Sequence, residues 1–420
     1  MTSIAIVDTI GLVYDGTTLE KRGLGGSESA VILLSRELAK LKFDVTVYNN
    51  CEDSQAGPGV YDGVKYRPLR DCQGAVHDIV VSSRTVLPFC QKNHFGMFTN
   101  VPVPYECFES LHKAKHKILW MHDTFCVGDN LLEEMVMAGQ IDEIFTLSDF
   151  HTTYVTNCDH GGRRNFEVLK NKIFVTRNGV VDHKKWVDIK AKDPDLFVYN
   201  ASVTKGMIPL VTKIWPELKR RIPTAKLMII GGFYRFRDGA PPDKQEEDWH
   251  RLREDYESRG LDIQFTGVIS QPAIADILSK ASYFLYPGAF PETYGISMME
   301  SMMYNTPLVT CRFGATEETA IADANYVINY AIEANSLFPS INTDSQCAKF
   351  IDAAEHAYRN KYLHQQKMYA CNRIKEFAGW DSVALQWKQH LFKKLGMYLP
   401  IDEYRRVSDI NERKIGRAHV

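Results

Sequence analysis

Short apolar, β-branched runs alternate with helical patterns along most of the chain, and this alternation occurs in two successive series. Alternation of this kind is typical of parallel sheets with crossover helices, which is the α/β class. The first series has predicted strands at Ser3–Asp8, Asp44–Asn49, Asp78–Ser83, Lys117–His122 and Glu143–Leu147. The second series has predicted strands at Leu196–Ala201, Lys226–Ile230, Ile263–Thr266, Tyr283–Tyr286 and Pro307–Thr310.

Helices are predicted between and after these strands, at Ser27–Leu41, Gly206–Ile222, Asp243–Arg259, Pro272–Lys280, Ile296–Tyr304, Asp344–Arg359, Tyr362–Phe377 and Asp381–Leu395. A charged segment that contains a proline, Asp188–Asp195, separates the two series and is predicted to be a linker. We therefore expect two Rossmann-like domains, at residues 1–187 and 195–380. A C-terminal helix at 381–397 is expected to pack back toward the N-terminal domain.

The chain has 420 residues, of which 45% are apolar and 24% charged, as in soluble proteins with two ordinary domains. Its formal net charge of -2 gives no electrostatic reason to expect a nucleic-acid partner. The chain starts with a predicted strand and not a signal peptide, and no apolar run reaches the roughly 20 residues that cross a bilayer. Nine cysteines without a C-x-x-C pair indicate a reducing compartment. We expect a cytoplasmic protein that is at most peripheral to a membrane.

Two further segments bear on metals and on the end of the chain. Asp193-Pro-Asp195 matches the D-x-D pattern of metal-dependent transferases, but it lies in the charged linker and is interpreted as solvated. No spacing of histidine, cysteine or carboxylate residues indicates a metal site, so no metal or other cofactor is expected.

Residues 415–420 match the translation of a common sequencing adapter, and we interpret them as an adapter-derived tail. The alternative is a natural basic tail.

The most informative stretch follows the predicted strand that ends at Tyr286. A Pro/Gly-rich loop carries Glu292, and the next helix carries Glu300, so the spacing is E-x7-E. Either glutamate by itself is more simply interpreted as a solvated or helix-start acid. Glu300, however, lies among methionines on its helix, and a carboxylate in apolar surroundings needs a partner. This favours a functional interpretation of the pair.

The amino end of the same helix is predicted to face an anion. The amides of Tyr294, Gly295 and Ile296 would have no partner within the helix, and the helix dipole favours negative charge there. A diphosphate fits this feature. One carboxylate of the pair could then meet sugar hydroxyls, and the other could meet a ribose on the far side.

The segment that starts at Glu292, with its spacing to Glu300 and the following Asn305-Thr-Pro-Leu-Val, resembles the donor-site signature of family 4 glycosyltransferases. The resemblance covers almost the whole chain and is strongest from about Tyr199 to Glu318. It implies the GT-B fold, a nucleotide-diphosphate sugar as donor, retention of anomeric configuration and no metal. It also implies that the donor is bound by Thr293, Tyr294, Gly295, Ile296 and Glu300.

Other segments match patterns of the same family. Gly25 and Gly26 belong to a segment that resembles its glycine-rich loop after the first strand, where glycines let a ligand approach the backbone. His122 stands where the family carries a histidine that contacts the transferring sugar. A lone histidine is more often structural, but its position at the end of a predicted strand favours the functional interpretation.

The loop after the first strand of the second domain also resembles the family. It carries Ser202 and Lys205, and the resemblance implies that the lysine binds donor phosphate. The family often has an arginine a few residues upstream, whereas this chain has Tyr199, Asn200 and Ala201 there. The missing arginine puts in doubt the donor affinity or the register of the loop.

We therefore expect a retaining, metal-independent hexosyltransferase with His122 and Glu292 in catalytic roles and an unknown glycan, lipid or protein as acceptor. Two alternatives stay open. The missing arginine is compatible with a catalytically impaired protein that binds a sugar nucleotide, and the same architecture serves GT-B epimerases and phosphorylases. Turnover of the donor separates these alternatives, because an impaired protein binds the donor without consuming it.

Overall fold

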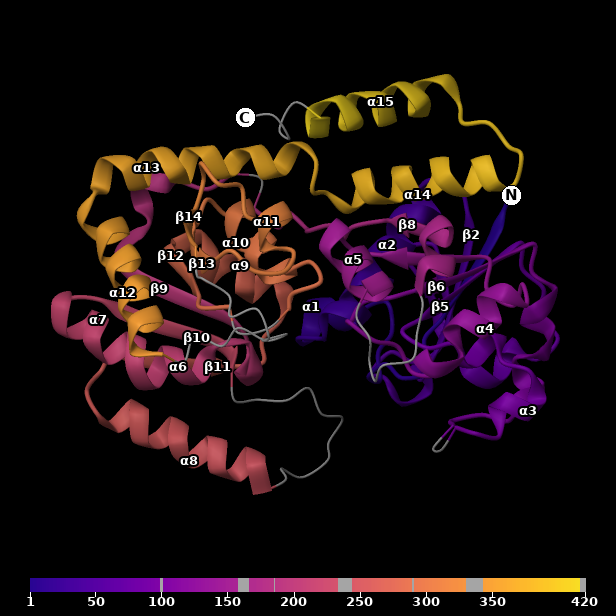
Figure 1. Cartoon of the computed structure of the whole chain (residues 1–420), viewed down its shortest axis with the longest axis horizontal. Helices are drawn as coiled ribbons and strands as arrows, with labels where there is room; N and C mark the ends of the chain where they lie inside the picture. Colours follow the sequence, from indigo (N-terminus) through magenta and orange to yellow (C-terminus); the bar gives the residue numbers. More distant parts are fainter. Residues whose placement is uncertain are drawn as a thin grey trace. The chain divides into compact units, whose positions relative to one another are not determined.

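This computed structural model describes residues 1–98, 101–157, 166–184, 186–232, 244–288, 291–329 and 343–415. The chain divides into two compact units (Figure 1). The first consists of Met1–Gly179 together with Gly379–Val420, and the second is Val180–Ala378. Each unit is built around its own sheet.

The sheet of the first unit has eight strands in the order β3-β4-β2-β1-β5-β6-β7-β8. The strands are β1 Ser3–Val7, β2 Asp44–Asn49, β3 Gly59–Tyr61, β4 Val64–Pro68, β5 Ile79–Ser83, β6 His116–Trp120, β7 Glu143–Thr146 and β8 Ile173–Val175. All neighbours pair in parallel except the β3–β4 hairpin. The central strands β1 and β5 are buried except at Ser3, as expected for a parallel sheet covered on both faces.

The helices of the first unit are α1 Thr18–Lys21, α2 Gly26–Lys40, α3 Lys92–Phe95, α4 Leu132–Met137, α5 Asp149–Asn157, α14 Trp380–Lys394 and α15 Ile401–Ile415. Helix α2 packs on β2 and β4 and also on α14. Trp387 of α14 is completely buried, and its ring lies edge-on to Trp120 and Phe145 of the sheet. The C-terminal helix α14 is therefore part of the core of the first unit.

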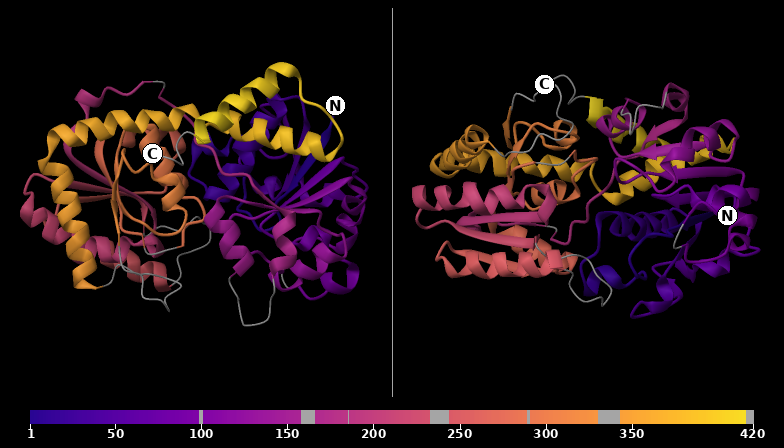
Figure 2. Two further views of the ribbon diagram at one scale, coloured as in Figure 1. Left: turned by 45° about the horizontal axis from the view of Figure 1, so that its top comes forward. Right: turned by 60° about the horizontal axis from the view of Figure 1, so that its bottom comes forward.

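The sheet of the second unit has six strands in the order β11-β10-β9-β12-β13-β14, and all of them are parallel. They are β9 Asp193–Ser202, β10 Lys226–Gly232, β11 Ile263–Gly267, β12 Ala281–Tyr286, β13 Leu308–Cys311 and β14 Tyr326–Ile328. The helices are α6 Met207–Pro209, α7 Trp215–Arg221, α8 Lys244–Ser258, α9 Gln271–Lys280, α10 Ile296–Met303, α11 Thr316–Thr319, α12 Asp344–Arg359 and α13 Lys361–Ala370. Helices lie on both faces of the sheet (Figure 2).

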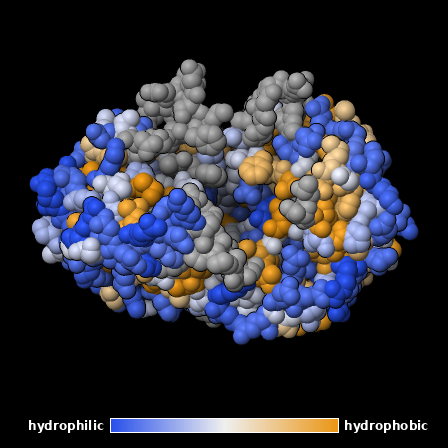
Figure 3. Space-filling model, turned by 90° about the horizontal axis from the view of Figure 1, so that it is seen from below, coloured by the Kyte–Doolittle hydropathy of each residue, from blue (hydrophilic) through white to orange (hydrophobic). Residues whose placement is uncertain are grey.

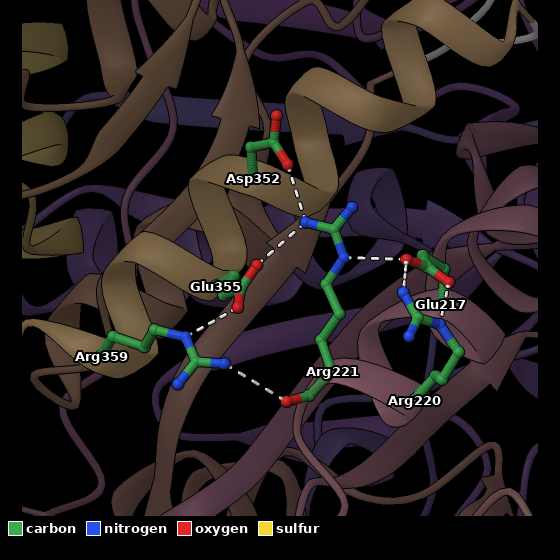
Figure 4. Close-up of polar contacts among 6 residues, drawn as sticks. All are labelled: Glu217, Arg220, Arg221, Asp352, Glu355 and Arg359. Atoms are coloured by element: carbon green, nitrogen blue, oxygen red, sulfur yellow. Dashed lines mark hydrogen bonds and ion pairs between the residues drawn. The ribbon is translucent and has the colours of Figure 1, made fainter.

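A network of ion pairs joins α7 to α12 on the surface of the second unit (Figure 4). Arg221 lies between Glu217 of its own helix, at 2.8 Å, and Asp352 and Glu355 of α12, at 2.8 and 2.9 Å. Arg359 also contacts Glu355. Single exposed pairs contribute little, but a network fixes the register of two helices better than an isolated pair does.

The boundaries of the units differ in position from the predicted ones. The first unit ends at Gly179 and resumes at Gly379, whereas the predicted domains end at 187 and 380. Residues after Gly179 are held by the second unit, since the Tyr304 hydroxyl donates to Val181 O and accepts from His183 N. Lys375 also pairs with Asp182 at 3.1 Å.

The predicted solvated linker at Asp188–Asp195 was wrong at its carboxyl end, because β9 already begins at Asp193. Lys192 is buried, and its ammonium donates to Leu278 O, Ala281 O and Thr306 Oγ1 at 2.7 to 2.9 Å. Burial lowers the pKa of Lys192 to about 7. Asp195 accepts hydrogen bonds from Tyr358 and Thr224, so it holds the start of the strand to α12.

Several elements were not predicted. The β3–β4 hairpin, β8 and β14 are short strands, and α15 follows the last predicted helix. The predicted helix at Gly206–Ile222 is divided into α6, a π-helical turn at Leu210–Ile214 and α7. Pro209 and Pro216 explain the division, because each lacks the amide that a regular helix would use.

No helix in the described parts of the chain is long and apolar enough to cross a membrane. The face shown in Figure 3 is mainly hydrophilic, and its hydrophobic residues lie in small groups. Residues 416–420 of the predicted adapter-derived tail lie outside the described residues.

Candidate functional site

The order of strands in the second unit reverses between β9 and β12, which are neighbours in the sheet. The chain moves from β9 through β10 to β11 on one side, and from β12 through β13 to β14 on the other. In open α/β sheets, ligands bind at the carboxyl ends of the strands where the order reverses. The loops after β9 and β12 carry Lys205 and Glu292, two of the residues selected from the sequence.

These two side chains form an ion pair. Lys205 Nζ lies 2.5 Å from Glu292 Oε1, and the side chain of Glu292 is 6% exposed while that of Lys205 is 30% exposed. The carboxylate is therefore shielded, and the ammonium can still be reached from outside. An ammonium has three donors, so Lys205 can contact an anion without leaving Glu292.

Glu292 has a second partner that the sequence did not point to. The hydroxyl of Tyr286, at the end of β12, donates a hydrogen bond to the same Oε1 atom. Burial, followed by the charge of Glu292, raises the pKa of Tyr286 well above its ordinary value. The hydroxyl therefore stays protonated and acts as a donor, which fixes the orientation of the carboxylate.

A second tyrosine stacks on Tyr286. The ring of Tyr199, on β9, lies 6.4 Å from it at an interplanar angle of 13°. The hydroxyl of Tyr199 donates to Ser202 O at 2.8 Å and so holds the end of β9. Ser202 itself is exposed, with its hydroxyl 3.1 Å from that of Thr204. The stacked tyrosines thus connect the two loops, and one of them lies in the segment where the family often has an arginine.

Two glycines allow these loops to approach other backbone. Gly206 has φ +101, and a Cβ there would lie 3.0 Å from Pro287 Cγ in the neighbouring loop. Gly314 has φ +63, and a Cβ there would lie 2.9 Å from Glu292 O. Both positions require glycine, because larger residues rarely adopt positive φ and would also press on the loop that carries Glu292.

Helix α10 begins directly after this loop. Gly295 is its N-cap residue with φ +80, and its carbonyl accepts from Met298 N and Met299 N at 3.0 and 3.2 Å. Thr293 and Tyr294 are buried, and Ile296 opens the helix. First-turn amides have no partner within a helix, so this end of α10 can receive an anion beside Lys205.

Glu300 is 8% exposed and lies on the eight-residue helix α10. Its partner is Gln271, the first residue of α9, whose Nε2 donates to Glu300 Oε1 at 3.1 Å. Burial raises the pKa of Glu300 to about 7, and the bond from Gln271 opposes this rise. The carboxyl group is therefore close to half-ionised near neutral pH.

The first sheet reverses its strand order between β1 and β5. Asp8 follows β1, Arg84 follows β5, and Arg84 lies 3.5 Å from Asp8 and 2.8 Å from Glu28 of α2. Gly25 precedes α2 and Gly26 opens it, so both glycines lie within three residues of Glu28. The predicted glycine-rich loop therefore stands beside a buried ionic cluster. Burial raises the pKa of Asp8, although Arg84 opposes that effect.

His122 lies two residues beyond β6 and is 6% exposed. Its ring lies 4.2 Å from that of Trp120. Burial, with smaller contributions from Arg84 and His151, lowers the pKa of His122 well below its ordinary value. The imidazole is therefore neutral, so it can donate from one nitrogen and accept at the other.

The structure thus joins Lys205 to Glu292 and places Glu300 on the helix that starts behind them, all in the second unit. Gly25, Gly26 and His122 belong to the first unit. Sequence reasoning missed Tyr199, Tyr286, Gln271, Asp8 and Arg84. Two of them, Asp8 and Tyr286, could have been selected from the sequence, because they lie at the ends of predicted strands.

Within the described ranges, no group of three or more histidine, cysteine, aspartate or glutamate side chains is placed to hold a metal ion. Asp193 pairs with Lys226 at 3.2 Å, and Asp195 bonds to tyrosine and threonine hydroxyls. The D-x-D pattern therefore stabilises the sheet.

Comparisons with known proteins agree with this geometry. Residues 182–341 match the family "Glycosyl transferases group 1". Over 75 residues the chain is 40% identical to the GDP-mannose-dependent alpha-(1-6)-phosphatidylinositol dimannoside mannosyltransferase of Mycobacterium tuberculosis. That match spans 18% of this chain and only 19% of the mannosyltransferase.

Two solved structures are similar over nearly the whole chain. Sucrose-phosphate synthase from Thermosynechococcus elongatus superposes with a TM-score of 0.66 at 14% identity, covering 94% of this chain and 99% of that one. Anabaena HepE in complex with UDP and glucose gives 0.62 at 10% identity, covering 93% and 99%. These likenesses confirm the predicted α/β class and GT-B fold.

Proposed function

Because residues 182–341 match the glycosyl transferases group 1 family, known as family 4 of the GT-B glycosyltransferases, we propose that this protein transfers a hexose from a nucleotide-diphosphate sugar to an acceptor with retention of anomeric configuration. The observation that carries the proposal is the Lys205–Glu292 ion pair at the strand reversal of the second sheet, in front of α10. It combines a cation for a diphosphate with a carboxylate for sugar hydroxyls.

The diphosphate is bound by charge and by backbone amides. Lys205 contributes an accessible ammonium, and the first turn of α10 contributes amides and a favourable dipole. Gly295, Ile296 and the exposed Ser202 lie in these two segments. As the bond to the sugar breaks, negative charge grows on the diphosphate, and these fixed groups stabilise it without reorganising. No metal is needed in this proposal.

Glu292 orients the donor sugar. Its carboxylate accepts from Lys205 and Tyr286 at Oε1, so a sugar hydroxyl can donate to Oε2. Thr293 and Tyr294 support the loop from buried positions. Glu300 accepts from the ribose hydroxyls, with Gln271 holding the other side of the carboxyl group.

The resemblance to the family implies roles for His122 and for the Gly25–Gly26 segment of the first unit. The neutral imidazole of His122 donates a hydrogen bond to the transferring sugar. Retention follows when the leaving phosphate takes the acceptor proton and the acceptor attacks from the same face. That route needs no enzymic base on the opposite face.

The acceptor is an unknown glycan, lipid or protein. The nucleotide of the donor is not assigned, because similar proteins use at least two. The mycobacterial relative uses GDP-mannose, and the HepE structure contains UDP and glucose.

We also propose a cytoplasmic location, at most peripheral to a membrane. In its support, the cysteines in the described ranges are all free and buried.

The deciding experiment screens nucleotide sugars for thermal stabilisation and then measures their turnover with candidate acceptors. A ligand at 100 times its Kd adds about 2.7 kcal/mol of stability, which is easily detected. Proton NMR of the product then gives the anomeric configuration. An α-linked product from an α-linked donor supports retention, and a β-linked product contradicts it. Binding without turnover would favour a catalytically impaired protein, and turnover without acceptor a GT-B epimerase.

A further inference from the structure

A pocket of about 460 Å³ lies in the first unit, and none of the residues that line it belongs to the candidate functional site. It is bounded by the ends of β8 and α5 and by α14, and its lining residues are Asp149, Phe174, Val175, Arg177, Gln386, Gln389, His390 and Lys393. The size is that of a small-molecule site, and most of its lining side chains are polar.

Two of the cations in this pocket lack a counter-charge. Arg177 and Lys393 form no ion pair with any carboxylate among the described residues. The neighbouring Lys394, in contrast, has a carboxylate partner in Glu143. Arg177 and Lys393 outnumber the one lining carboxylate, that of Asp149, so the pocket carries a net positive charge.

The carboxylate that contacts the lining residue His390 is already neutralised. Glu143 of β7 accepts from His390 Nε2 and His116 Nε2 at 2.8 Å each, and Lys394 Nζ lies 2.5 Å from its Oε1. Together these partners hold the pKa of Glu143 well below its ordinary value. The same bond fixes His390, whose ring also stacks on Phe174 at 3.9 Å. One wall of the pocket is thus rigid.

The position of Arg177 is fixed as well. The preceding Thr176 is buried and accepts a hydrogen bond from Trp387 Nε1. Gly179 is pressed against Trp380, where a Cβ would meet the ring at 2.6 Å. Arg177 itself has φ +66, a conformation that is unfavourable for arginine and persists only when its surroundings impose it. Binding an anion here would cost little ordering of the backbone.

We propose that this pocket binds a phosphate group. The planar guanidinium of Arg177 can contact two phosphate oxygens, and Lys393 supplies a second positive charge. Gln386 and Gln389 place carboxamides in the same pocket, and these suit hydroxyl groups beside a phosphate. The ligand class is inorganic phosphate or a sugar phosphate. The proposal does not depend on the sugar-transfer reaction, because it uses none of those residues.

Isothermal titration with inorganic phosphate and with mannose 6-phosphate tests the proposal on the full chain. Arg177→Asn and Lys393→Gln should each weaken binding of both probes by about tenfold or more, since each removes a charge-assisted contact. Asparagine tolerates positive φ, and Lys393 is exposed, so both variants should fold. Lys113→Gln, an exposed charge change elsewhere in this unit, should bind as the wild type does. Lys205→Ala should lose only binding that belongs to the donor site and keep the binding assigned to this pocket.

The two probes identify the source of the phosphate. Tighter binding of mannose 6-phosphate supports a sugar phosphate, and equal binding supports recognition of the phosphate group alone. The proposal is overturned if neither probe gives saturable binding to the wild type. It is also overturned if Arg177→Asn and Lys393→Gln both bind as tightly as the wild type, or if binding is lost only in Lys205→Ala.

Discussion

Replacing Glu300 with glutamine should stabilise the protein while weakening its donor binding. The side chain lies on α10 with 8% exposure, and Gln271 Nε2 donates to its Oε1 at 3.1 Å. A glutamine side chain has the same shape and keeps a carbonyl oxygen for that bond. The substitution therefore removes a buried charge and little else.

The size of the effect follows from the pKa of Glu300, which burial raises from 4.5 to about 7. The unfolded chain releases this proton at a lower pH than the folded protein does. The folded state is therefore penalised as the pH rises above 4.5, and the penalty is complete above about 7. It amounts to about 3 kcal/mol at pH 8 and to about 1 kcal/mol at pH 5. Glu300→Gln should recover these amounts.

Thermal unfolding of the wild type and of Glu300→Gln at pH 5 and pH 8 measures the difference. For a domain of about this size, 1 kcal/mol shifts the Tm by roughly 2–4 °C, so the gain at pH 8 should exceed that at pH 5 by several degrees. Lys192, with its lowered pKa of about 7, also titrates in this range, but it is present in both proteins and cancels. Glu317→Gln, on an exposed turn of α11, is the matched control.

The same variant should bind the nucleotide donor less tightly, because a neutral amide accepts weakly from ribose hydroxyls. Stabilisation together with loss of binding would mark Glu300 as a residue kept for function. Equal Tm shifts at the two pH values would refute the reasoning, since the charge would then not be the cause. A lower Tm at pH 8 would show that the ionised carboxylate has a stabilising partner.

Five further predictions concern the same site and the end of the chain. Lys205→Ala should weaken nucleotide-diphosphate binding by about 1.5–3 kcal/mol and leave nucleoside binding nearly unchanged in calorimetry, and equal losses would make the lysine structural. Glu292→Ala should cut turnover by orders of magnitude in a protein whose circular dichroism is unchanged, whereas Tyr286→Phe should keep the ring stack and reduce kcat by about tenfold, the loss of one hydrogen bond. Excess chelator should leave activity intact, and activity that returned only with manganese would contradict a metal-independent reaction. Deleting residues 416–420 should not change Tm or turnover, and a clear fall in either would show that the tail is part of the folded protein.

The sequence alone predicted the α/β class of both units. Alternating apolar runs and helical patterns are local properties, so β2 and α12 were predicted with their observed bounds. The short strands β3, β4, β8 and β14 were missed, because three to five residues carry too little pattern to be separated from a loop. The charged composition of Asp188–Asp195 indicated a linker, but Lys192 is buried because three oxygens from distant segments receive its ammonium.

The residues of the candidate site were likewise predicted only in part from the sequence. The E-x7-E spacing and the glycine before α10 are sequential, so Glu292, Gly295 and Glu300 could be selected from the chain itself. Only the tertiary structure decided what these residues meet. Lys205 and Glu292 are far apart in sequence, and they meet because they follow β9 and β12, which are neighbours in the sheet.

The partners found only in the structure share one physical cause. Tyr199, Tyr286 and Gln271 are unremarkable in sequence, because a tyrosine on a strand or a glutamine at a helix start is compatible with many environments. Burial made their hydrogen bonds necessary, since a carboxylate removed from water must be satisfied by the groups that the fold places around it. Sequence thus determined which residues carry charge, and packing decided which neutral side chains fix that charge in place.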